Sequence, residues 1–265
     1  MDDGQNSLQM PVLFVGHGSP MNAIEDNPWS RGFRALSEGM QPPRAILAVS
    51  AHWYVDGTFL TASARPETIH DFGGFPEPLY RIRYPAPGDP ALAVRAAGLL
   101  GLREEPLSAA WGIDHGTWSV LLHMFPKADI PVVQLSIDSR LAPKDHLALG
   151  SALAPLRYEG VLIMASGNIV HNLRDAFGQM HQGACTTPAW ATGFDAAVAR
   201  ALEARDTAFL VRALETEEGR LSHPTPDHYL PLLYAAGAAE ETGAISFPIS
   251  GFDMVSLSMR AVIFR

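Results

Sequence analysis

The chain has 265 residues, of which 47% are hydrophobic and 18% are charged. This length is enough for one large domain or two small ones. The formal net charge of −9 argues against non-specific nucleic-acid binding, because phosphate contacts need clustered Lys and Arg. The single cysteine, Cys185, excludes an internal disulfide and is typical of a reducing compartment.

The beginning of the chain bears on localisation. The first ten residues, MDDGQNSLQM, are acidic and polar, unlike the basic start of a signal peptide. No apolar run approaches the roughly 18 residues that a membrane helix needs. We therefore expect a cytoplasmic protein with no membrane partner, in which a tail over residues 1–10 precedes one domain over residues 11–265.

Short apolar runs bounded by Gly, Pro or polar residues predict buried strands. In chain order these strands cover residues 11–16, 45–50, 58–62, 131–137, 161–166 and 261–264. Helical patterns lie between them, at residues 28–40, 89–101, 143–157, 187–205 and 226–237. The alternation predicts an α/β fold: a single domain with a mostly parallel or mixed central sheet and helices on both faces. The long connection over residues 63–88 is rich in Pro, Gly and aromatics, which favours an ordered functional loop.

Three histidines come at or shortly after the ends of predicted strands. His17 follows PVLFVG, His52 follows AILAVSA, and His171 comes just after VLIMASGN. Ligands of open α/β sheets bind beyond the carboxyl ends of the strands. One such histidine is equally well explained as a turn residue, but three in matching positions favour a site at one edge of the sheet.

Two further histidines have informative contexts. His228 lies in HPTPDHYLPLL, where Pro226 predicts a helix start with Asp227 and His228 in its first turn. The alternative is that Asp227 only favours the helix dipole and His228 is a surface residue. His115, in WGIDHGTW, is expected in a glycine-flanked loop beside Asp114.

Several histidines from distant segments suggest metal chemistry, because imidazole is a good ligand for iron, zinc and copper. Without a cysteine pair or short ligand spacing, a structural zinc site is not expected. The chain contains no phosphate-binding glycine motif and no GxSxG, and nothing local marks Ser19 as a nucleophile. This pattern suits a catalytic metal with open coordination positions.

Six segments occur in an order that resembles the 4,5-DOPA extradiol dioxygenase family, a branch of the class III extradiol ring-cleavage dioxygenases. They are GHGSPMNAIEDNP, ILAVSAHW, TIHDFGGFPEPLYRIRYPAPG, GIDHGTWSVLLHMFP, VLIMASGNIVHNL and HPTPDHYLPLLYAAGAA. The resemblance extends over nearly all of the chain after the tail. It implies a single α/β catalytic domain with a non-haem Fe(II) site, which Zn(II) sometimes occupies in purified members.

The resemblance also implies roles for the five histidines. His17, His52 and His228 match metal ligands, and His171 matches an acid/base residue that is also described as a ligand. His115 matches the DHG motif, so it is expected to line the substrate pocket and is a second candidate base. The related protocatechuate enzymes have a glutamate among their ligands, and a histidine in that place removes one negative charge from the site.

The implied reaction inserts both atoms of O2 into a catechol such as L-DOPA and opens its ring beside a hydroxylated carbon. The expected partners are a small catechol and O2, and a homo-oligomer stays open. Phe72, Phe75 and Tyr80 are expected to pack on the aromatic ring, and Arg81 or Arg83 to meet a carboxylate. The alternative for this loop is that it only covers the core.

Two other functions fit the same histidines. A zinc-dependent hydrolase would use them to hold a metal and a nucleophilic water. A non-catalytic relative would keep the fold as a binding module. Oxygen uptake with a catechol separates the dioxygenase from both, because a redox-inert zinc holds a catechol without passing electrons to O2.

Overall fold

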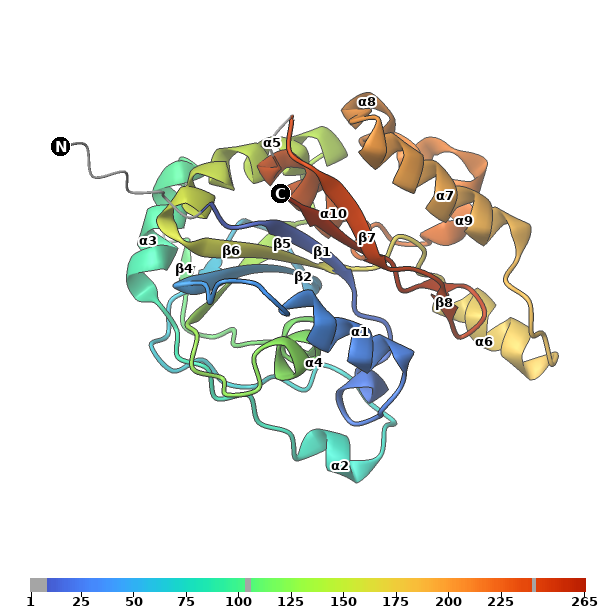
Figure 1. Ribbon diagram of the computed structural model, residues 1–265, viewed down its shortest axis with the longest axis horizontal. Helices are drawn as coiled ribbons and strands as arrows, with labels where there is room; N and C mark the ends of the chain where they lie inside the picture. Colours follow the sequence, from blue (N-terminus) through green and yellow to red (C-terminus); the bar gives the residue numbers. More distant parts are fainter. Residues whose placement is uncertain (1–8, 103–105, 240–241) are drawn as a thin grey trace.

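The computed structural model describes residues 9–102, 106–239 and 242–265. Within these residues, the centre of the molecule is one mixed eight-stranded sheet in the order β4-β3-β5-β2-β6-β1-β10-β7 (Figure 1). The strands are β1 (Val12–Gly16), β2 (Ala45–Val55), β3 (Leu60–Thr61), β4 (Leu107–Ser108), β5 (Val132–Asp138), β6 (Val161–Gly167), β7 (Ile245–Ile249) and β10 (Ala261–Phe264). A separate pair consists of β8 (Phe252–Asp253) and β9 (Leu257–Ser258).

The four long central strands β1, β6, β2 and β5 are parallel to one another, whereas β10 joins β1 antiparallel and β7 joins β10 antiparallel. The predicted α/β fold with a mixed sheet is therefore confirmed. The helices are α1 (Pro28–Leu36), α2 (Glu77–Tyr80), α3 (Pro90–Leu99), α4 (His115–Met124), α5 (Pro143–Leu153), α6 (Leu173–His181), α7 (Ala189–Glu203), α8 (Thr207–Leu210), α9 (Glu217–Ser222) and α10 (Leu230–Ala238).

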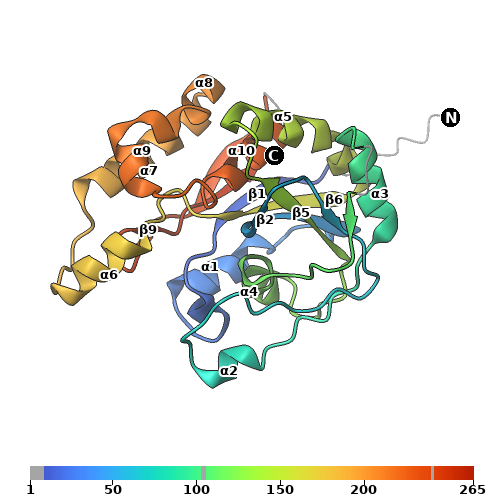
Figure 2. The same cartoon turned by 180° about the vertical axis from the view of Figure 1, so that it is seen from behind.

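Alternation along the strands divides the core into two layers. Val12 and Phe14 of β1 belong to the cluster that includes residues of α3, α5, α7 and α10. Leu13 and Val15, which point to the opposite face, belong to the cluster with residues of α1 and α4. Figures 1 and 2 accordingly show α5 and α10 on one side of the sheet and α1 and α4 on the other. Both faces are covered, as predicted.

Helix ends follow their capping residues in some places and depart from prediction in others. Asp89 accepts a hydrogen bond from the backbone N of Leu92 and caps α3, as its position before a proline predicts. The helix expected from Pro226 begins only at Leu230, because the preceding turn is held by a bond from the backbone N of Asn168 to the carbonyl of His228 (2.9 Å). Asp227 and His228 therefore precede the helix.

Two other local predictions were wrong. His115 is not in a loop but is the first residue of α4, whose cap is the Asp114 side chain. Strand β2 continues to Val55 beyond its predicted end at Ser50, so His52 lies within it. The register of β2 against β5 shifts between Val49 and Tyr54, which marks an irregularity around this histidine.

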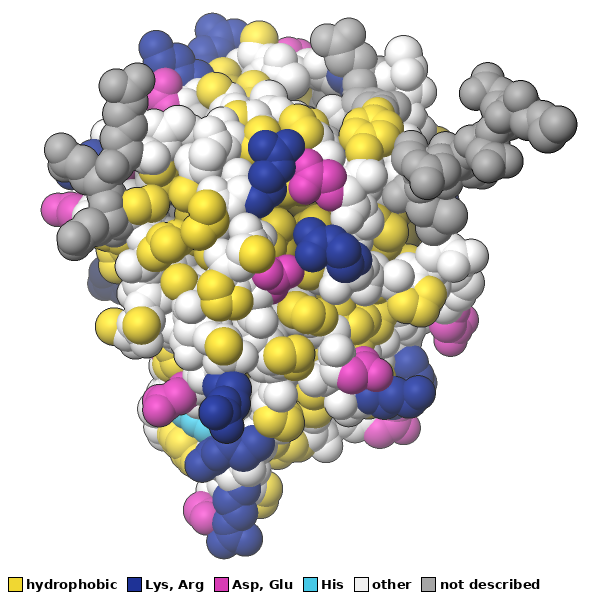
Figure 3. Space-filling model, turned by 90° about the vertical axis from the view of Figure 1, so that its left-hand side faces the viewer, with side chains coloured by type: hydrophobic (Ala, Val, Ile, Leu, Met, Phe, Trp, Pro, Cys, Tyr) yellow, Lys and Arg dark blue, Asp and Glu magenta, His cyan; other side chains and the backbone are white. Residues whose placement is uncertain are grey.

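The surface at the amino ends of the parallel strands carries both charge signs. On the face drawn in Figure 3, acidic and basic side chains are interspersed among apolar and uncharged ones. Ion pairs join Arg44 to Asp89 and Arg95 to Glu159 near the starts of β2 and β6. In the described part of the chain, no helix has both the length and the apolar character needed to cross a membrane.

Candidate active site

A cavity of about 330 Å³ at the carboxyl ends of β1, β2 and β6 brings together all five histidines singled out from the sequence. They are His17, His52, His115, His171 and His228. Three neighbouring parallel strands deliver His17, His52 and His171 to this edge, as the strand-end pattern predicts. The site thus forms at the position where open α/β sheets bind ligands.

The tautomer of His17 follows from its hydrogen bonds. Its backbone N bonds to the carbonyl of Gly167 (3.1 Å), which places the ring beside β6. Its Nδ1 lies 2.9 Å from Oγ of Ser166, and that hydroxyl donates its own proton to the carbonyl of Gly116 (2.5 Å). Since the hydroxyl has one proton, it accepts from His17, so Nδ1 is protonated and Nε2 carries a lone pair.

His52 presents the same nitrogen to the same point. Its Nδ1 lies 3.1 Å from Oδ2 of Asp71. Although burial raises the pKa of Asp71, the hydrogen bonds that it accepts from the side chain and backbone of His115 help to lower it to about 2. The carboxylate is therefore an acceptor, which leaves His52 Nε2 unprotonated, 3.0 Å from Nε2 of His17.

Two imidazole lone pairs at this separation repel each other unless a cation lies between them. Two nitrogens that are each about 2.0–2.1 Å from one metal ion lie roughly 3 Å apart when the bond angle is near 90°. The measured distance between the Nε2 atoms of His17 and His52 is 3.0 Å. The donor pair therefore fits a divalent metal.

His115 contributes a third nitrogen to the group. Its backbone N and its Nδ1 bond to the two oxygens of Asp71, each at 2.9 Å. One nitrogen each from His17, His52 and His115 lies within 4.8 Å of the others, and all three could bind one ion. The sequence predicts that His115 lines the substrate pocket; it does line this cavity, and its contact with a substrate stays a prediction.

His228 and His171 form the opposite side of the site. The Asp227 carboxylate accepts a hydrogen bond from Nδ1 of His228 and so leaves its Nε2 unprotonated. The His228 ring centroid lies 5.3 Å from that of His17 and 5.0 Å from that of His52. His171 stacks on His228 with 3.4 Å between centroids.

Burial keeps the imidazoles of His17, His52, His171 and His228 neutral. Desolvation, aided by the neighbouring histidines, lowers the pKa values of His17 and His228 well below the usual 6.5. The same effects lower the pKa of His52 to about 3 and that of His171 to about 4. The neutral imidazole is the form that binds metals and accepts protons, so the site is ready for both at neutral pH.

The predicted substrate residues fall into two groups. Phe72 and Phe75 line the cavity, with ring centroids 5.4 Å apart. Tyr80 packs behind them, 5.2 Å from the Phe72 centroid, and Arg83 donates to the carbonyls of Tyr80 and Ile82. Among the described residues, neither Tyr80 nor Arg83 lines the cavity. Contact of Tyr80 and Arg83 with the substrate therefore stays a prediction.

The rest of the apolar wall was not predicted. Leu173 and Phe177 of α6 and Met254 and Leu257 of the β8–β9 hairpin line the cavity. Figures 1 and 2 both show α6 beside this hairpin. The i, i+4 spacing of Leu173 and Phe177 is the one sequence signal for the wall, and it is too short to identify a helix. Met254 has φ 45°, a left-handed conformation that is uncommon outside glycine.

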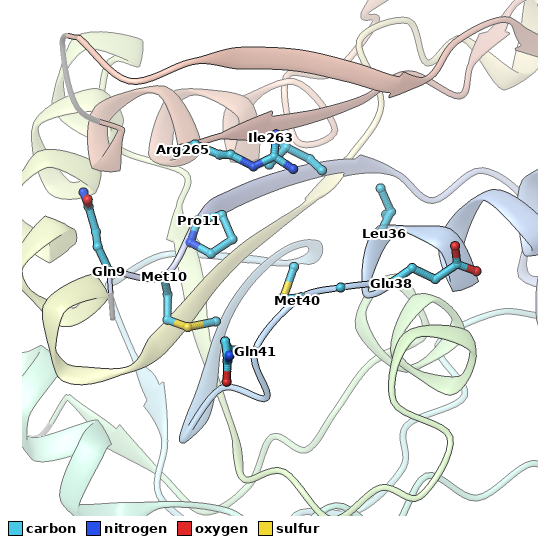
Figure 4. Close-up of a pocket in the computed structure, with 10 residues that line it drawn as sticks. Gln9, Met10, Pro11, Leu36, Glu38, Met40, Gln41, Ile263 and Arg265 are labelled. Atoms are coloured by element: carbon cyan, nitrogen blue, oxygen red, sulfur yellow. The ribbon is translucent and has the colours of Figure 1, made fainter. Parts of the chain in front are cut away.

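A second cavity, of about 310 Å³, lies at the opposite end of β1 near Met10 and Leu36. Figure 4 shows Arg265 alongside Ile263 and the Glu38 carboxylate pointing away from them. The described residues that line it include no histidine. The histidine cavity is therefore the candidate active site.

Comparison with known proteins identifies the family of this chain. The model of the catalytic LigB subunit of aromatic ring-opening dioxygenase matches residues 11–258. The chain is 49% identical over 261 residues to a protein of Escherichia coli (strain K12) named 4,5-DOPA dioxygenase extradiol, covering 97% of this chain and 95% of that protein. A Beta vulgaris protein of the same name is 41% identical over 250 residues, covering 91% of each chain.

A solved structure has the same fold. The crystal structure of an uncharacterized protein from Escherichia coli K12 matches with a TM-score of 0.83 and 44% identity, covering 97% of this chain and all of that one. The family match extends from β1 to β9 and includes all five histidines of the cavity. The chain therefore belongs to the family of the catalytic LigB subunit of aromatic ring-opening dioxygenases.

Proposed function

We propose that the protein is a metal-dependent extradiol dioxygenase that opens the ring of a catechol such as L-DOPA with O2. The observation that carries this proposal is the pair of unprotonated Nε2 atoms of His17 and His52, 3.0 Å apart. The family match and the printed names of the relatives supply the reaction class. Fe(II) is the proposed cofactor, with Zn(II) as an inactive occupant of the same site.

For the metal we propose His17, His52 and His228 as ligands, with His171 adjoining them. Each of the three has a partner on Nδ1, respectively Ser166, Asp71 and Asp227, which leaves Nε2 for the ion. Neutral imidazoles make the set softer and less negative than one with a carboxylate. A divalent iron bound there would lower the pKa of the catechol hydroxyls and supply electrons to O2.

The remaining groups handle the proton and the ring. The imidazoles of His171 and His115 are the groups that accept a proton from a catechol hydroxyl. Both rings line a cavity whose other wall is apolar, so bulk water competes little for that proton. Phe72 and Phe75 supply aromatic faces against which the ring packs edge-on or offset.

The deciding experiment is an oxygen-electrode assay of protein loaded anaerobically with Fe(II). L-DOPA, dopamine, protocatechuate and catechol are compared, and absorbance is recorded for a ring-opened semialdehyde. Uptake of O2 together with the coloured product supports the proposal. No uptake with any of them at full iron occupancy contradicts it and favours a hydrolase that uses the same histidines.

A further inference from the structure

One carboxylate contacts two of the five histidines at once. Oδ2 of Asp71 lies 3.1 Å from Nδ1 of His52 and 2.9 Å from Nδ1 of His115. Oδ1 accepts the backbone N–H of His115 at 2.9 Å. The side chain is largely buried, with 15% of its surface exposed, and it lines the cavity. The role given above to Asp71 concerns His52 alone, and its contact with His115 is a second one.

The fold fixes the position of this carboxylate. Residues 67–69 run beside Ile113, with bonds from Ile69 N to the Ile113 carbonyl and from Ile113 N to the Glu67 carbonyl, both 2.8 Å. The indole of Trp118, in α4, donates to the carbonyl of Ile69 (2.8 Å). The loop is therefore attached to the chain before His115, at Ile113, and after it, at Trp118 of α4, and Asp71 is held opposite the His115 ring.

We propose that Asp71 is a positioning residue that holds His52 and His115 in the same tautomer, with Nδ1 protonated and Nε2 free. In this arrangement one side chain orients a metal ligand and a proton acceptor together. The inference rests on the metal site proposed above, because the two unprotonated Nε2 atoms are taken to serve that site. The inference gives a role to a residue of the loop over residues 63–88, for which the sequence predicted only aromatic and arginine contacts with substrate.

An amide in place of the carboxylate cannot satisfy the same three donors. If the Asn oxygen faces the two rings, its NH2 group opposes the backbone N–H of His115. If the NH2 group faces the rings, it donates to both Nδ1 atoms, and each ring moves its proton to Nε2. Either orientation breaks the arrangement, and the second removes the lone pair of His52 that faces His17.

The first measurement uses the metal-free wild-type protein. Long-range proton–nitrogen NMR of histidine labelled with ¹⁵N reads the tautomer of each ring directly. The inference requires protonated Nδ1 and unprotonated Nε2 at both His52 and His115. A protonated Nε2 at either ring would overturn it, whatever the variants do.

The second measurement is Zn(II) affinity, from competition with a chelator, for wild type and for Asp71→Asn, Asp71→Glu and Glu77→Gln. Loss of a partner that orients a metal-binding histidine typically lowers affinity about 10–100-fold, and we expect this for Asp71→Asn. Asp71→Glu keeps an acceptor and should recover part of the affinity. Glu77→Gln is the matched control, because its carboxylate pairs with Arg81 on the surface of the same loop.

The outcomes separate this inference from the proposed function. If wild type binds no divalent metal, the proposed function fails. If wild type binds Zn(II) and Asp71→Asn binds it equally well with unchanged tautomers, the role of Asp71 fails alone. Lower affinity together with a changed tautomer at His52 or His115 supports it.

Discussion

The imidazole rings of His171 and His228 are stacked, with centroids 3.4 Å apart and planes inclined by only 3°. Asp227 holds the Nδ1 of His228, and the backbone N of His171 bonds to the carbonyl of Ser222 (3.0 Å). The two residues are thus held separately, and their rings meet face to face. This arrangement places a proposed proton acceptor directly against a proposed metal ligand.

Replacing His171 by Gln is expected to lower kcat about 10²–10⁴-fold, the usual range for an acid/base group, while the metal is retained. The reason is that the side chain contacts a ligand without being required to hold the ion. Turnover of L-DOPA and metal content after dialysis measure the two effects. Metal loss as large as in His52→Ala would instead place His171 among the ligands.

The third ligand is tested by comparing His228→Ala with His115→Ala. We expect the first to lose the metal, as His52→Ala should, and the second to keep it but turn over slowly. The geometry makes this a sharp comparison, because a His115 nitrogen lies within 4.8 Å of those of His17 and His52. The reverse pattern of metal content would assign His115 to the ion and His228 to the proton.

Any side chain in place of Gly167, at the end of β6, is expected to destabilise the fold. A Cβ at this position would lie 2.2 Å from the carbonyl oxygen of His228, which is backbone and cannot rotate away. Gly167→Ala should lower the free energy of unfolding by about 1–3 kcal/mol, as overpacking does, and should weaken Zn(II) binding. Gly178→Ala in α6 is the control, because its Cβ meets nothing within 4 Å. Equal unfolding curves for both variants would contradict the prediction.

The stability of the metal-free protein should depend on pH through buried His223. Burial lowers its folded pKa to about 4, below the value of about 6.5 in the unfolded chain. As pH falls from about 6.5 to 4, the unfolded state takes up the proton first, and stability falls by at most about 1.4 kcal/mol per pH unit. Above this window the contribution is constant.

The matching variant is His223→Gln, which keeps a donor for the carbonyl of Ile169 but does not titrate. Urea unfolding at pH 7 and pH 5 should show a smaller loss for the variant than for wild type. A remaining loss is expected, because His17, His52 and His228 titrate in the same direction. Identical losses would show that His223 does not contribute.

The arginine contact with the substrate carboxylate is tested by Arg83→Gln. The Arg83 guanidinium donates to the carbonyls of Tyr80 and Ile82, and it is exposed. We therefore expect KM for L-DOPA to stay unchanged, whereas Phe72→Ala in the cavity wall should raise it. If Arg83→Gln raises KM for L-DOPA but not for dopamine, the result would support the predicted contact between Arg83 and the substrate carboxylate.

Sequence alone predicted the sheet-borne part of the site, because buried parallel strands give continuous apolar runs with clear ends. His17 is the best case, since β1 ends at Gly16, directly before it. His52 was predicted to follow a strand although it lies within one. The polar His52 interrupts the apolar run, and the register of β2 against β5 shifts around it. Its side chain nevertheless reaches the predicted edge.

The parts that could not be predicted depend on contacts between distant segments. Asp71 meets His52 and His115, which lie 19 and 44 positions away, and no local periodicity records such a contact. Leu173 belongs to the short helix α6, and Met254 directly follows the two-residue strand β8. Both elements are too short for their hydrophobic pattern to be distinctive. Their place in the cavity depends on tertiary packing.

The separation between the histidines at the central strands and the apolar wall formed by α6 and the β8–β9 hairpin has a consequence for how this enzyme could be adapted to new compounds. His17 and His52 are tied to hydrogen-bonded strands, whereas Phe177 and Met254 belong to elements outside the central sheet. Replacing a wall residue changes which molecules fit without disturbing the spacing of the nitrogens. Libraries confined to residues 173–177 and 254–257 should therefore yield altered selectivity at preserved metal content, which makes this half of the cavity the place to begin redesign.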